Sequence, residues 1–248
     1  MPKHPIELKN PPIVESIVEI RFNSIFPDEV VFGIFYGAIK SRYNKIEELN
    51  TAKIPKEIIE NEPTLKFAPH YLVEAEDKPL ALMIGPKVLV FKYQKHYKKT
   101  TKYPGWHNFI YNEIMETLTL ITKDNYIKEV LRIGLRTIDF VEDDIFKNLN
   151  ISINMTKREL DSLEKTIRFN IKENGFDNIV AISNSSVLMI DNKPNKGSTI
   201  DIDTSKESII TENIDTYLSE ILSSGHETNK NLFFELITEE YKKELEKK

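Results

Sequence analysis

The sequence predicts an α+β protein with two similar lobes, each an antiparallel sheet with a long helix packed on one face. Two observations support this fold class. In each half of the chain, short segments with alternating apolar residues precede a long segment with apolar residues at helical spacing. The order of these segments is similar in both halves, which is consistent with a tandem duplication. We expect an N-terminal lobe over residues 1–126 and a C-terminal lobe over residues 127–248.

The first half begins with a segment in which Val18, Ile20 and Phe22 alternate with charged residues, as in a strand with one buried face. A proline precedes each helical segment, a position that suits the first turn of a helix. Two later apolar runs flank a Gly-Pro-Lys turn and predict a hairpin. The expected strands cover residues 11–22, 70–77, 79–84 and 87–93, and the expected helices cover residues 28–46 and 104–123.

The second half shows the same kinds of pattern. Its first strand is similar in character to the first strand of the chain, and the sequence Asn-Ser-Ser at residues 184–186 predicts a hairpin turn. A closing helix begins near residue 211 and is predicted to be interrupted near Gly225. The expected strands cover residues 129–143, 165–174, 178–183, 187–191 and 198–205.

The composition is that of a folded protein. The chain has 248 residues, of which 40% are hydrophobic and 29% charged, which is enough to bury a core. The net charge of -5 gives no general attraction for nucleic acid, so such binding would need a local patch. The absence of cysteine excludes disulfides, thiol nucleophiles and cysteine-based zinc sites. Because no signal-peptide or membrane-span pattern is evident, we expect a cytoplasmic protein without a membrane partner.

Residues 92–103, KYQKHYKKTTKY, hold five lysines, three tyrosines and one histidine and lack acidic residues. Lysines can contact phosphates while aromatic rings stack on bases, which is the pattern of a single-strand nucleic-acid binder. Lysines are also common in exposed connectors, and tyrosines near a strand end often pack on the sheet. We favour the solvated connector and retain as binding candidates Lys95, His96, Tyr97, Lys98, Lys99 and Lys102.

A second constellation pairs Glu15 and Glu19 on one predicted strand with Arg132 and Arg136 on another. Residues four apart on a strand share a face, and opposite charges on neighbouring strands attract each other. The favoured interpretation is a set of ion pairs that joins the two halves. The alternative is a charged pocket in which Arg132 and Arg136 bind a carboxylate or a phosphate.

The sequence contains neither the residue spacing of a common metal site nor a known catalytic motif. Asp201 and Asp203 share one strand face, but no third ligand is near them in the sequence. None of the five histidines has the helical spacing of a zinc hydrolase, and neither a serine elbow nor a glycine-rich phosphate loop is present. We therefore predict no catalytic residues, no metal and no cofactor, and we interpret Trp106, His107 and His226 as structural residues.

Four segments, NPPIVESIVEIRF, YPGWHNFIYNEI, LRIGLRTIDF and HETNKNLFFELIT, resemble a sporadically distributed bacterial family of conserved hypothetical proteins. They are spread over nearly the whole chain and keep the order of that family's pattern. The resemblance implies bacterial accessory biology, such as phage defence or a toxin–antitoxin module. It implies no catalytic residues.

Three functions stay open. The favoured one is a non-catalytic binding protein that recognises a protein partner or assembles with itself, because catalytic motifs are missing and the charge balance is acidic. The second is a small-molecule or nucleotide enzyme with a site between the lobes, where Arg132, Arg136 and Asp139 are the residues of interest. The third is nucleic-acid binding through residues 92–103.

Overall fold

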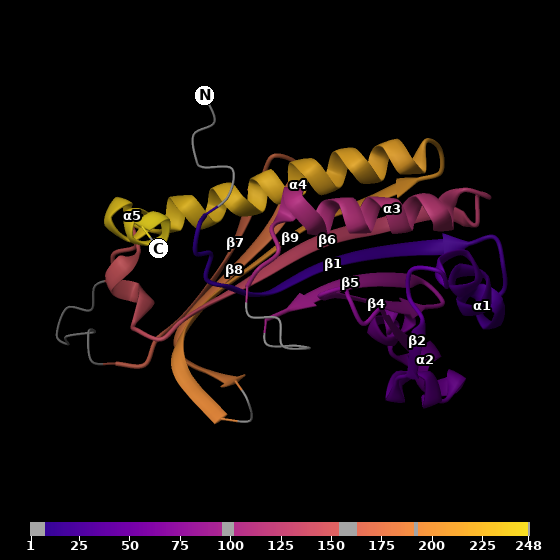
Figure 1. Cartoon of the computed structure of the whole chain (residues 1–248), viewed down its shortest axis with the longest axis horizontal. Helices are drawn as coiled ribbons and strands as arrows, with labels where there is room; N and C mark the ends of the chain where they lie inside the picture. Colours follow the sequence, from indigo (N-terminus) through magenta and orange to yellow (C-terminus); the bar gives the residue numbers. More distant parts are fainter. Residues whose placement is uncertain (1–7, 96–101, 154–162, 191–192, 248) are drawn as a thin grey trace.

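The chain forms one continuous nine-stranded antiparallel sheet, in the order β2-β3-β4-β5-β1-β6-β9-β8-β7, with helices along it (Figure 1). This computed structural model describes residues 8–95, 102–153, 163–190 and 193–247. Helices and antiparallel strands are both present, as the α+β prediction requires, but the expectation of two separate lobes is wrong. The proposed division at residues 126 and 127 falls between α3 and β6.

The strands are β1 (Ile13–Ser24), β2 (Lys45–Glu48), β3 (Tyr71–Glu74), β4 (Leu80–Gly85), β5 (Val88–Gln94), β6 (Ile127–Val141), β7 (Thr166–Glu173), β8 (Phe176–Ile190) and β9 (Lys193–Ile210). The longer helices are α1 (Asp28–Ile39), α2 (Lys56–Asn61), α3 (Tyr111–Thr122), α4 (Ile214–Leu236) and α5 (Glu239–Lys247). Short helical turns are η1 (Asn50–Lys53), η2 (Pro63–Phe67), η4 (Trp106–Ile110) and η5 (Ile145–Asn148). Among these described helices, none is both long and apolar enough to cross a membrane.

The two halves merge because their first strands pair with each other. In each half the first strand also pairs with the last strand, β1 with β5 and β6 with β9. That arrangement leaves one edge of β1 and one edge of β6 with unpaired backbone groups, and an open edge favours pairing with another strand. The antiparallel β1–β6 pairing, in which Val18 lies opposite Leu135, joins both edges into one sheet.

One face of the sheet carries the hydrophobic core. Helices α3 and α4 run side by side along this face (Figure 1), and α1 packs beside α3. Alternation along β1 places Val18, Ile20 and Phe22 in this core, as predicted. The same core includes Leu218 from α4, so it is built by both halves of the chain. A second core cluster lies where the end of α4 and α5 pack over β8 and β9.

Two local predictions of the second half are also wrong. Strand β8 continues through the Asn-Ser-Ser sequence, with only an irregular register between Ser183 and Ser186. Helix α4 continues through Gly225 and ends at Leu236. A Cβ atom at Gly225 would lie 2.8 Å from Leu135 Cδ1 and 3.3 Å from Phe176 Cε1. Glycine therefore permits close packing of α4 on the sheet instead of ending the helix.

Candidate ligand-binding recess

A recess of about 400 Å³ lies between the two core clusters, where the segment before β1, η4, β6 and α4 meet. Trp106 of η4 contributes an aromatic ring to its lining, and Phe233 and Phe234 contribute apolar surface from α4. A concave, largely apolar site with a few polar groups is typical of a small-molecule site. Its lining comes from four segments that are far apart in the sequence, around residues 8–13, 102–108, 137–139 and 226–234.

Asp139 is the unusual group in this recess. Its position on β6 places it on the same sheet face as Leu135 and Thr137, and the residue is only 2% exposed. Within the part of the chain that the structure describes, its carboxylate has no hydrogen bond or ion pair. Burial, with a smaller contribution from the charge of Asp201, raises the pKa of Asp139 to about 8. A buried carboxyl group without a partner is costly, and a bound ligand could supply the partner.

Asn229 fixes α4 over the sheet beside this carboxyl group. Its Nδ2 donates a hydrogen bond to Ile202 O at 3.0 Å, and its Oδ1 accepts one from Thr137 Oγ1 at 2.7 Å. The side chain is 3% exposed, and these bonds connect α4 to β9 and β6. One amide side chain therefore links the helix to both strands beside the recess.

The tryptophan wall is shaped by a local departure from α-helical geometry. Gly105 has φ = 86°, a conformation that favours glycine, and Ile110 N donates to Gly105 O at 3.1 Å across five residues. Such π-helical turns often occur at functional sites. Trp106 is 3% exposed, and its Nε1 is buried without a hydrogen-bond partner among the residues that the structure describes. Trp106 thus belongs to the core, as predicted, and also lines the recess.

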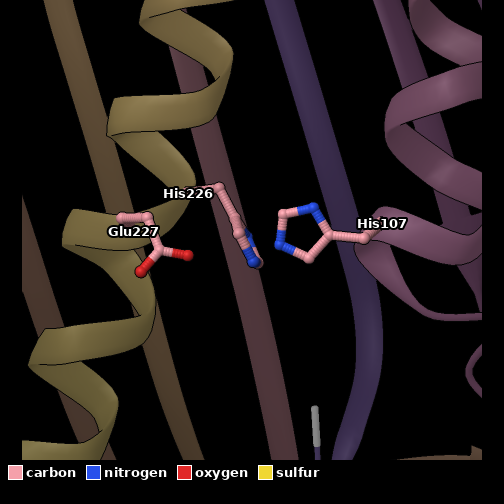
Figure 2. Close-up of side chains that lie close together, drawn as sticks. All are labelled: His107, His226 and Glu227. Carbon is pink, nitrogen blue, oxygen red and sulfur yellow. The ribbon is translucent and has the colours of Figure 1, made fainter. Parts of the chain in front are cut away.

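The Trp106 ring stacks on the His226 ring at a centroid distance of 4.4 Å and an interplanar angle of 8°. His107 meets His226 edge to face at 5.6 Å. Figure 2 shows the two imidazoles next to each other and nearly perpendicular, with the Glu227 carboxylate beside His226. Burial, helped by the nearby Lys230 and His107, lowers the pKa of His226 to about 3, so its imidazole is neutral. The sequence favours a structural role for both histidines, and their proximity is visible only in the fold.

The lysine- and tyrosine-rich stretch is described only at its ends. His96, Tyr97, Lys98 and Lys99 lie outside the described residues. Tyr93 is fully buried, which raises its pKa to about 12, and its ring packs against Tyr103. Lys95 follows β5, whereas Lys102 is exposed and lines the recess. Whether the stretch binds nucleic acid stays a prediction.

Arg132 and Arg136 lie on the opposite face of the sheet from the recess and are engaged in ion pairs. Arg132 Nη1 contacts Glu19 Oε1 at 2.7 Å across the β1–β6 junction. Arg136 forms a bidentate ion pair with Asp201, in which Nε donates to Oδ1 at 2.8 Å and Nη2 donates to Oδ2 at 2.6 Å. Glu15 pairs with Lys92 instead of an arginine. Strands β1 and β6 are neighbours, which is the condition for the ion-pair interpretation. Both arginines also contact aspartates of β9, so they join three strands.

Sequence reasoning missed most of the recess because four distant segments build it. Asp139 was named only as a residue of interest in the enzyme hypothesis, and Asn229 was not singled out. The sequence does carry one signal for this site. Asp139 is the next residue in the alternating series Ile133, Leu135 and Thr137, which places an aspartate on the apolar side of a strand.

A scan against models of protein families finds no match to this chain, and a search of curated proteins finds none similar to it.

Proposed function

We propose that this chain is a non-catalytic binding protein whose recess holds a ligand with a cationic nitrogen. The ligand would be an organic amine or guanidine, or the lysine or arginine side chain of a protein partner. The single observation that supports this proposal is the buried carboxyl group of Asp139, which lines the recess without a partner in the described structure.

The apolar and aromatic part of the lining suits the stem of such a ligand, whereas three lysines also line the recess and add positive charge. Aromatic and proline side chains, among them Trp106 and Phe233, can cover a hydrocarbon stem or contact the cation through a ring face. An ionised Asp139 would form a charge-assisted hydrogen bond with the cation in a low-dielectric site. The recess volume of about 400 Å³ is in the range of small-ligand sites.

The proposal retains the binding function that the sequence favours and makes its chemistry specific. A protein partner that inserts a basic side chain would fit the expected role in accessory bacterial biology, which stays a prediction. The enzyme hypothesis gains no support from Arg132 and Arg136, because both are paired with carboxylates on the other sheet face.

A titration can test the proposal through Trp106, the only tryptophan of the chain, which lines the recess. Benzylamine, benzamidine and N-acetyl-arginine amide should change its fluorescence in a saturable way. Benzyl alcohol and benzoate, which match benzylamine in shape, should bind much more weakly. Asp139→Asn should weaken amine binding by roughly tenfold or more, the scale expected for losing a buried charged hydrogen bond. Equal binding of amine and alcohol, or an unchanged affinity in the variant, would refute the assignment.

A further inference from the structure

The imidazoles of His107 and His226 and the carboxylate of Glu227 form a compact group beside the recess (Figure 2). One potential ligand atom of each residue lies within 4.8 Å of the other two. His107 belongs to η4, whereas His226 and Glu227 belong to α4, so the packing of two helical elements brings them together. We propose that these three residues bind one divalent transition-metal ion of the Zn²⁺ or Co²⁺ type.

The donor set selects this class of ion. Two imidazole nitrogens and one carboxylate oxygen suit Zn²⁺ and its neighbours, whereas Ca²⁺ and Mg²⁺ prefer oxygen ligands. Atoms bound about 2.0–2.2 Å from a tetrahedral zinc lie roughly 3.4 Å apart, so the ligands must close by roughly 1.4 Å or less. His107 and Glu227 are exposed and can make this adjustment by side-chain rotation.

Two of the ligands are already oriented by their neighbours. The stack on Trp106 fixes the plane of the His226 ring. Lys230 Nζ holds Glu227 Oε1 at 2.7 Å, which leaves Glu227 Oε2 available to a metal. Such outer contacts fix the orientation of metal ligands. With three protein ligands, one coordination position stays open to water or to a donor atom of a bound molecule.

The same tryptophan supplies the assay. Trp106 lies against His226, so a paramagnetic Co²⁺ ion at this site should quench its fluorescence. The full-length chain is first freed of metal with a chelator and then titrated with Co²⁺. We expect saturable quenching at one equivalent, recovery of fluorescence when Zn²⁺ displaces Co²⁺, and a higher melting temperature with Zn²⁺ because the metal binds the folded state.

Conservative variants separate a built site from surface binding. His107→Gln and Glu227→Gln should each weaken Co²⁺ binding by about tenfold or more and abolish the Zn²⁺-dependent rise in melting temperature. His226→Gln should weaken metal binding to a similar extent. This variant lacks the ring stack on Trp106, so its Zn²⁺ binding is measured by calorimetry instead of fluorescence. Glu220→Gln removes the same charge from an exposed position of α4, and His70→Gln removes a histidine elsewhere; both should bind like the wild type.

The metal-binding proposal and the amine-binding proposal can be tested independently of each other. Asp139→Asn should retain the Co²⁺ affinity of the wild type, and His107→Gln should retain amine binding. The metal proposal is overturned if the wild type binds Co²⁺ no more tightly than His107→Gln, or if the Glu220 and His70 controls weaken binding as much as the ligand variants. Circular dichroism confirms that each variant is folded, so a loss of binding can be assigned to the ligand.

Discussion

Replacing Asp139 by asparagine should stabilise the folded protein, and the gain should grow with pH. Burial raises the pKa of the carboxyl group from 3.8 to about 8. Between these values the unfolded chain carries a carboxylate while the folded chain keeps the proton. The free energy of unfolding of the wild type therefore falls as pH rises through this range, by about 1.4 kcal/mol per pH unit for this group.

The amide of Asp139→Asn cannot ionise, so the variant lacks this contribution. The difference in unfolding free energy between variant and wild type should increase by roughly 4 kcal/mol from about pH 5 to about pH 8, and then level off. Any packing cost of the amide is independent of pH and shifts the whole curve without changing its slope. A slope is therefore a safer readout than the stability at a single pH.

Urea denaturation followed by circular dichroism at four pH values gives the required curves. Asp143→Asn, at an exposed aspartate four residues further along the chain, controls for the loss of one negative charge. A flat difference between Asp139→Asn and the wild type would mean that the carboxyl group is ionised in the folded protein. In that case Asp139 would not be a costly, protonated carboxyl group, and its burial would give no reason to expect a ligand.

Three further outcomes are expected. Amine affinity, measured by Trp106 fluorescence, should rise by up to about tenfold per pH unit below about pH 8, because the cation binds the ionised form of Asp139; a constant affinity would contradict this. Glu113→Gln should lower the unfolding free energy by about 3 kcal/mol in urea denaturation, because Glu113 neutralises two partly buried cations at 2.7 Å and 2.5 Å; a change near zero would contradict the expected pairing. Gly37→Ala should raise the melting temperature, because a Cβ atom there meets open space and alanine adds up to about 1 kcal/mol of helix propensity. Gly225→Ala should lower the melting temperature, because its Cβ atom would collide with Leu135. Equal shifts of the melting temperature in the two variants would contradict this difference in packing.

Local patterns predicted much of the secondary structure. The alternation of Val18, Ile20 and Phe22 marked the buried face of β1, and the apolar stripe from Trp106 onward marked η4 and α3. These patterns depend on residues within a few positions of one another. The presence of helices and antiparallel strands followed from them.

What the sequence could not predict depends on contacts between distant segments. The pairing of β1 with β6 depends on which strand edges meet, and the alternation of side chains does not encode it. Glycine is common directly after the end of a helix, so Gly225 predicted a helix end. In the folded chain its role is to allow close contact of α4 with Leu135. The recess and the His107–His226 pair arise from the packing of η4 against α4, so only the folded chain places these residues together.

The pairing of β1 with β6 at the middle of the sheet also determines how the molecule can come apart. If the halves separated, each would expose a long row of unpaired amides and carbonyls, together with apolar side chains that the other half now covers. Neither half is thus suited to exist as an independent folding unit, and the protein should lose its structure in a single cooperative transition. If the two halves are expressed as separate fragments, each should aggregate or, when both are present, associate with the other.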